Sequence, residues 1–151
     1  MRTKSQIGKA NRAAGSRFEA KVRHDLESKG WIVARWSNNV KLEECKTSNG
    51  NGKMINLLSD AHHELVPAKS TRFRSNTHGF PDFIAIRPKK NLKTIDKELL
   101  FYNHGVEVKS NGYLKPEERA KCKWLLDNHI FSKILIAKKG KKRGEIIYNE
   151  I

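Results

Sequence analysis

Cysteine, long apolar runs and acidic side chains are all scarce in this sequence. Its two cysteines, Cys45 and Cys122, are too few for a disulfide framework, so we expect both to be reduced thiols. A zinc site built from these two with His62 and His63 is conceivable, but no pair has the close spacing of zinc ligands. The scarcity of cysteine therefore excludes a disulfide-stapled fold and disfavours a zinc protein.

The longest clean apolar run, ILIA at 134–137, is far shorter than the roughly 20 residues that span a bilayer. Residues 1–15 also lack the apolar stretch of a secretory signal. We therefore expect no membrane partner and a cytoplasmic location, in the host cytoplasm if the gene is viral. At 151 residues, with 37% hydrophobic and 31% charged residues, the chain predicts a single globular domain.

Acidic residues are outnumbered, with 16 Asp and Glu against 31 Lys and Arg, which gives a formal net charge of +15 and a pI near 10.0. The basic residues occur along the whole chain, so no detachable tail accounts for the charge. Such an excess favours a polyanionic partner, most often nucleic acid. A thermophilic or merely soluble basic surface is the alternative that charge alone leaves open.

The hydrophobic pattern predicts an α/β fold, with a mixed β-sheet flanked by helices. Residues 1–15, basic and rich in Gly and Ala, predict a flexible arm or the frayed start of a helix, and an apolar residue at every fourth position from Phe18 predicts a helix that ends at Gly30. Residues 38–78 predict a loop-rich insert, with a hairpin near 49–52 and a short helix near 55–65. We expect strands at 31–36, 83–86, about 99–110, 132–139 and 145–148, and a second helix at 116–129.

Three ionisable residues, Asp82, Glu107 and Lys109, stand out on two of these strands. Residues two apart in a strand share a face, so Glu107 and Lys109 lie on one side while Val106 and Val108 lie on the other. If the strands that carry them pair, Asp82 and Glu107 come within reach of one cation. Hard oxygen ligands suit Mg²⁺, and the Val108 carbonyl is a further candidate ligand. Lys109 would then orient the attacking water and stabilise charge on the phosphate.

Pro81-Asp82 followed by Glu107-Val108-Lys109 resembles the PD-(D/E)xK signature of restriction-endonuclease-like nucleases. Residues 15–35 also resemble the first helix and strand of archaeal Holliday-junction resolvases and virus-type replication-repair nucleases. An acidic residue on that helix completes the metal site in those families, and Glu19 occupies the matching place. The likeness covers residues 15–37 and 79–138.

The resemblance implies a restriction-endonuclease-like core in αβββαβ order and a Mg²⁺-dependent DNA endonuclease, with Mn²⁺ as a substitute. It further implies 5′-phosphate products, a homodimer and a preference for particular DNA structures such as Holliday junctions. One departure concerns the helix after the lysine, where those families often carry Gln. This chain offers Glu118, Arg119 or Lys121 instead.

The basic turn at 138–144 and the Arg- and Phe-containing segment 70–79 suit contacts with nucleic acid, although each also reads as a solvated loop. The residues we expect to contact nucleic acid are Arg17, Arg35, Arg72, Arg74, Ser110, Lys141, Lys142 and Arg143.

Several alternatives stay open from the sequence. Ser16 and Glu19 fit a helix-capping box as well as Glu19 fits a metal site. Asp82, Glu107 and Lys109 could each be an ordinary solvated residue, and only their combination favours a nuclease. The main alternative function is a non-catalytic basic nucleic-acid-binding protein on the same fold; an RNA nuclease or a nucleoid protein is a weaker one.

Overall fold

The computed structural model describes residues 3–42, 45–48, 54–57, 63–68, 79–89 and 101–151, with the backbone alone for 45–48 and 54–57. The candidate residues Arg72 and Arg74 lie outside these ranges. Within the described residues, no helix has the length and apolar character needed to cross a membrane.

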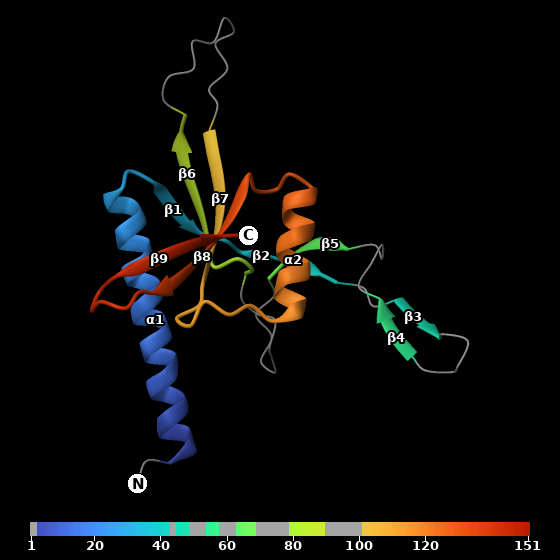
Figure 1. Cartoon of the computed structure of the whole chain (residues 1–151), viewed down its shortest axis with the longest axis horizontal. Helices are drawn as coiled ribbons and strands as arrows, with labels where there is room; N and C mark the ends of the chain where they lie inside the picture. The colour runs from blue at the N-terminus through green and yellow to red at the C-terminus, as the bar shows by residue number, and fades with distance from the viewer. Residues whose placement is uncertain (1–2, 43–44, 49–53, 58–62, 69–78, 90–100) are drawn as a thin grey trace, which may run out of the picture.

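The main sheet has five strands in the order β1-β6-β7-β8-β9 (Figure 1). β1, β6 and β7 pair antiparallel, β8 runs parallel to β7, and β9 closes the sheet antiparallel to β8. The predicted mixed sheet is thereby confirmed. The strand bounds are Ile32–Arg35 for β1, Phe83–Pro88 for β6, Phe101–Val108 for β7, Lys133–Lys139 for β8 and Ile146–Glu150 for β9.

One helix packs on each face of this sheet, α1 (Lys4–Ser28) and α2 (Pro116–Asp127) (Figure 1). The four-residue spacing of Phe18, Val22 and Leu26 puts them on one stripe of α1, which packs against one face of the sheet. Leu125 of α2 packs with Ile134 and other residues on the opposite face. Because both faces are covered, β7 and β8 are buried at successive positions, and the sheet end between the helices can hold groups away from water.

The insert contains strands where mostly loop was expected. β2 (Asn38–Lys41) pairs with β5 (Glu64–Pro67), and β3 (Cys45–Ser48) pairs with β4 (Met54–Leu57), all antiparallel. The pairing of β3 with β4 confirms the expected hairpin. The prediction of a short helix near 55–65 is wrong, since β4 covers the start of this range and β5 its end. A short apolar run carries too few residues for its period to separate strand from helix.

The first helix begins much earlier than its apolar pattern. Thr3 caps it, accepting the Gln6 backbone N–H through Oγ1 at 3.3 Å, while the Gln6 side chain accepts the Thr3 N–H at 3.0 Å. Residues 4–15 are therefore helical, so of the two expectations for them the helix start is borne out and the flexible arm is wrong. The capping-box interpretation of Ser16 and Glu19 is wrong, because both lie inside α1, where the backbone N–H groups already have helical partners.

Candidate active site

Asp82 and Glu107 meet where β6 begins and β7 ends. The antiparallel register places Phe83 opposite Val106, so the next pair outward is Asp82 and Glu107. The Asp82 N–H donates to Glu107 Oε2 at 3.2 Å, and the Val108 N–H donates to Asp82 Oδ2 at 2.8 Å. Each carboxylate is thus held by the backbone of the other strand, which fixes their relation without help from flexible side chains.

Close packing beneath this pair depends on Gly105. A Cβ atom there would come within 2.9 Å of Pro81 Cγ and 3.1 Å of a ring carbon of Phe131. Pro81 is fully buried directly before Asp82. The missing side chain at Gly105 therefore lets Pro81 pack against β7 and bring Asp82 up to Glu107.

Lys109 follows Glu107 on the same side of the chain and links it to α2. Its Nζ lies 3.0 Å from Glu107 Oε1 and 2.6 Å from Glu118 Oε1. Glu118 also accepts the Lys115 N–H through its other oxygen at 2.8 Å, so it is fixed at the first turn of α2. The ammonium group is therefore held between two carboxylates and aimed at the site.

Burial and mutual repulsion disturb the protonation of these carboxyls. Glu107 is only 4% exposed. Burial, followed by the charge of Asp82, raises its pKa to about 8, against the opposing effect of Lys109. Burial likewise raises the pKa of Asp82, and the charge of Glu19 adds to the rise. Lys109 has a raised pKa because hydrogen bonds and charges from Glu118 and Glu107 outweigh its burial, so it stays protonated.

Glu19 lies near this pair, lining a cavity with Val108 and Ser110, but its carboxylate is paired with Arg35. It influences Asp82 electrostatically, while its own Oε2 pairs with a terminal guanidinium nitrogen of Arg35 at 3.1 Å. Within the described parts of the chain, no three His, Cys, Asp or Glu side chains converge as a metal-binding group. The structure thus brings together Asp82, Glu107 and the backbone of Val108, and leaves the predicted third carboxylate turned toward β1.

The donor atoms present nevertheless fit a divalent cation. Two carboxylates share a buried place where one of them has a pKa of about 8, so positive charge is in deficit there. Hard carboxylate oxygens are the donors that Mg²⁺ prefers. Asp82 and Glu107 would hold the ion, and the Val108 carbonyl and Glu19 stay predicted additional ligands.

The other predicted residues divide into two groups. Ser110 lies at the site, lining a cavity with Val108, and Arg35 reaches it through Glu19. Arg17 on α1 is exposed. The turn between β8 and β9 carries the remaining described residues of this kind, all exposed: Lys141, Lys142 and Arg143.

Glu118 is the residue whose role the sequence did not assign. It was only one of three candidates on its helix, and the structure selects it through its contact with Lys109. Lys121 instead pairs with Glu117 at 2.9 Å, and the Arg119 Nε donates to the Leu114 carbonyl. Two adjacent glutamates, Glu117 and Glu118, suit the first turn of a helix because of its dipole, but this pattern does not show which of them reaches the lysine.

Cys122 does not behave as a metal ligand in this arrangement. Its side chain is fully buried in the core under α2, and burial raises the pKa of its thiol to about 12. A thiol with so high a pKa does not ionise readily, and zinc binds the thiolate.

Comparisons with models of known protein families, with curated protein sequences and with solved structures give no match. The chemistry of this site is therefore inferred from its own residues.

Proposed function

We propose that this protein is a metal-dependent DNA endonuclease of the PD-(D/E)xK kind. The observation that carries the proposal is the placement of Asp82 and Glu107 opposite each other, with Lys109 bonded to Glu107. Three residues that are 25 and 2 positions apart in the sequence meet at one sheet end, which is the arrangement that the motif implies.

The fold and the charge support the same proposal. Leaving aside the insert 38–78, the elements run α1, β1, β6, β7, α2, β8 and β9, and this mixed α/β sheet supports a restriction-endonuclease-like core. A net charge of +15 suits a phosphate-rich substrate. An α/β sheet with this order is compatible with many activities, so the site residues weigh more than the fold.

Each residue has a defined part in phosphodiester hydrolysis. A divalent cation bound here would polarise the phosphoryl oxygen and lower the pKa of a bound water. Asp82 and Glu107 hold that cation, and the Val108 N–H orients Asp82 by binding Oδ2. Lys109 positions the attacking water and stabilises the charge that develops on the phosphate. Glu118 keeps Lys109 protonated and directed at the site.

The test is cleavage of labelled linear duplex and of a four-way junction at low salt. Each substrate is incubated with the wild-type protein in Mg²⁺, in Mn²⁺ and in EDTA, and with Asp82→Ala protein purified alongside. We expect cutting that needs metal and is lost in the variant, with 5′-phosphate ends. The ratio of junction to duplex cleavage measures structure selectivity. Salt-sensitive binding without cleavage of either substrate would contradict the proposal and favour the non-catalytic alternative.

A further inference from the structure

The half of α1 that precedes the site makes no contribution to the core. From Lys4 to Arg17 no side chain is buried, and the first buried residue of the helix is Phe18. This half projects beyond the end of the sheet (Figure 1). Because most helical stability in proteins comes from packing, a projecting helix of this length needs a reason other than the fold.

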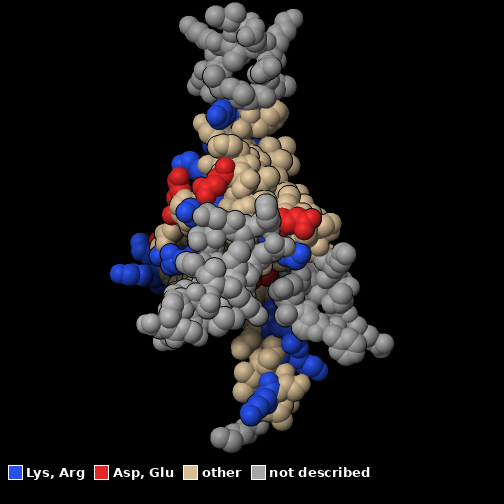
Figure 2. Space-filling model, turned by 90° about the vertical axis from the view of Figure 1, so that its right-hand side faces the viewer, with Lys and Arg blue, Asp and Glu red and all other residues tan. Residues whose placement is uncertain are grey.

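All the charged residues of the projecting half are basic. It carries Lys4, Lys9, Arg12 and Arg17, and the sequence has no Asp or Glu before Glu19. In Figure 2 the projecting lower part of the molecule shows Lys and Arg but no acidic side chain. Lys4 lies in the first turn of α1, where a cation interacts unfavourably with the helix dipole, so it does not stabilise the free helix. The four cations together suit an external polyanion.

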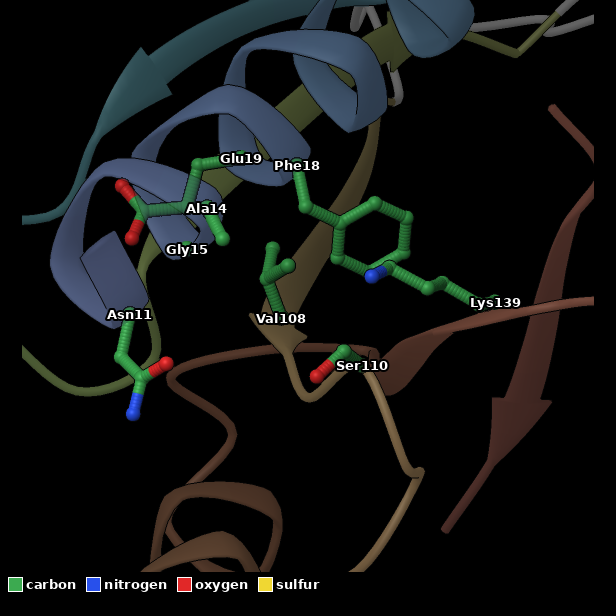
Figure 3. A pocket seen from close by; sticks show the side chains of 8 residues that line it. All are labelled: Asn11, Ala14, Gly15, Phe18, Glu19, Val108, Ser110 and Lys139. Atoms are coloured by element: carbon green, nitrogen blue, oxygen red, sulfur yellow. The ribbon is translucent and has the colours of Figure 1, made fainter. Parts of the chain in front are cut away.

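A cavity of about 240 Å³ opens between this half and the site (Figure 3). Asn11, Ala14, Gly15 and Glu19 belong to its helical wall, and Val108 and Ser110 lie across from them. A Cβ atom built at Gly15 would meet nothing within 4 Å, so the small residues leave this wall open. The cavity therefore gives access from the basic half of α1 to the backbone that binds Asp82.

A second cavity, of about 390 Å³, continues from the first along the β8–β9 turn. The two share Phe18 and Lys139, and Lys139 Nζ lies 5.5 Å from the centroid of the Phe18 ring. The second cavity is lined by Lys21 of α1 and by the cations of the turn, together with one acid, Glu145. Cations thus line the cavity at the turn, and Lys139 continues them into the cavity at the site, where the acid is Glu19 in its pair with Arg35. Two adjoining cavities of this kind form a groove that suits a chain of phosphates better than a single anion.

We propose that one strand of DNA lies in this groove, between the projecting half of α1 and the β8–β9 turn, and is led past Ser110 to the carboxylates. The inference rests on the proposed function in taking DNA as the polyanion. It gives the basic, unburied half of α1 a role, and it makes Lys139 and the open wall at Ala14 parts of the substrate path.

Two neighbouring alanines provide a matched test. Ala14 lines the groove, whereas Ala13, also exposed, is one residue earlier and about 100° away around the helix. Ala14→Glu and Ala13→Glu change the net charge equally, carry the same helix propensity, and can each pair with Arg17 one turn on. They differ in which face of α1 receives the new carboxylate.

Binding of a fluorescent DNA duplex is measured by anisotropy in EDTA, so that no cleavage is required. We expect Ala14→Glu to weaken binding about tenfold or more, and Ala13→Glu by less than about threefold, since only the first puts a negative charge in the phosphate path. Circular dichroism checks that both variants keep their helix content. Lys139→Gln should also lower the dependence of log affinity on log salt by about one unit.

Equal weakening by the two glutamates would overturn the groove, because binding would then depend on net charge alone. This outcome is distinct from failure of the proposed function, since the anisotropy is measured without metal. The two variants can differ in DNA affinity even if the protein never cuts DNA. They can also bind DNA equally even if the protein does cut it.

Discussion

The two ends of the β6–β7 pair belong to one antiparallel ladder but differ in their side chains. One end gathers carboxylates, and the other gathers cations over aromatic rings. At the site end, Asp82 and Glu107 bind each other's strand and Lys109 completes a buried ionic cluster. At the far end, the Arg87 guanidinium carbon lies 4.4 Å from the centroid of the Trp31 ring. The His104 ring also contacts Trp31 in a tilted arrangement, with their centroids 4.7 Å apart.

At the far end, the described charged side chains are cations that lie on aromatic rings, and no two carboxylates lie together among them. Arg87 and Lys89 lie over the Tyr102 ring, where they keep contact with water while covering apolar surface. His104 is buried, and burial lowers its pKa, so it is neutral there. The site end instead keeps two carboxylates together out of water, at a cost that raises the pKa of Glu107 to about 8. Two carboxyls buried together with raised pKa values, even beside a lysine, are typical of functional sites.

The largest difference between the two ends should follow from removing Lys109. Lys109→Met takes away the cation that supports the attacking water, and we expect single-turnover cleavage to fall by about 10²–10³-fold. Lys133→Met is the matched control, since Lys133 pairs with Glu150 on a neighbouring strand at 2.7 Å and lies opposite His104. We expect single-turnover cleavage by Lys133→Met to change by less than about twofold. Similar losses in both variants would show that the ends do not differ in function.

The raised pKa of Glu107 predicts how stability changes with pH in the metal-free protein. A carboxyl with a higher pKa in the folded state binds more protons there than when unfolded, so its contribution to stability falls as pH rises from about 4.5 to about 8. Urea unfolding in EDTA should show a wild-type loss between pH 6 and pH 8 that exceeds the loss in Glu107→Gln by on the order of 2 kcal/mol. If stability falls equally with pH in wild type and Glu107→Gln, the pKa of Glu107 is not raised by burial and by the charge of Asp82.

Glu118 allows a finer test of the site end, because Glu117 beside it is a natural control. Glu118→Gln weakens the 2.6 Å contact that holds Lys109, and we expect kcat to fall about tenfold with little change in KM. Because Glu118 raises the pKa of Lys109, the alkaline limb of the pH–rate profile should also move to lower pH. Glu117→Gln, which loses only the exposed side of a pair with Lys121, should leave both unchanged. If the pH profile of Glu118→Gln does not move, Glu118 does not tune Lys109, and its role is only to cap α2 through the Lys115 N–H.

The smallest effect is expected at the far end. Arg87→Gln removes the cation above Trp31 and should lower the free energy of unfolding by about 0.5–1 kcal/mol, as measured by urea denaturation. Cleavage should be unchanged. A large loss of activity in this variant would extend the site along the whole strand pair.

The sequence was sufficient to predict the five strands of the main sheet, because strand periodicity is a local property. The meeting of Asp82 with Glu107 was predicted only on the condition that their strands pair, which the structure shows. It did not reveal which residue of α2 reaches Lys109. That depends on how the helix is rotated on the sheet, which is decided by packing of Leu125 and Cys122. Nor did it show that Glu19 pairs with Arg35, since this contact joins a helix to a strand 16 residues on.

The start of α1 was mistaken for a different physical reason. Residues 4–15 carry no apolar stripe, so the signal for a helix began only at Phe18, and Ser16 with Glu19 then fitted a cap. The true cap, Thr3 with Gln6, precedes a segment that the core does not stabilise. The sequence left this segment open between a flexible arm and a helix start, and the structure decides for the helix. Its basic surface led to the proposed groove.

The most direct test of the site end is whether a divalent cation stabilises it. Thermal unfolding is followed at pH 7.5 with EDTA and with millimolar Mn²⁺, for wild type, Asp82→Asn and Arg87→Gln. A ligand that binds only the folded state stabilises it by RT ln(1 + [L]/Kd). We predict that Mn²⁺ raises the melting temperature of wild type and Arg87→Gln by several degrees and leaves Asp82→Asn nearly unchanged. An equal shift in all three, or none in any, would contradict a cation site at Asp82 and Glu107.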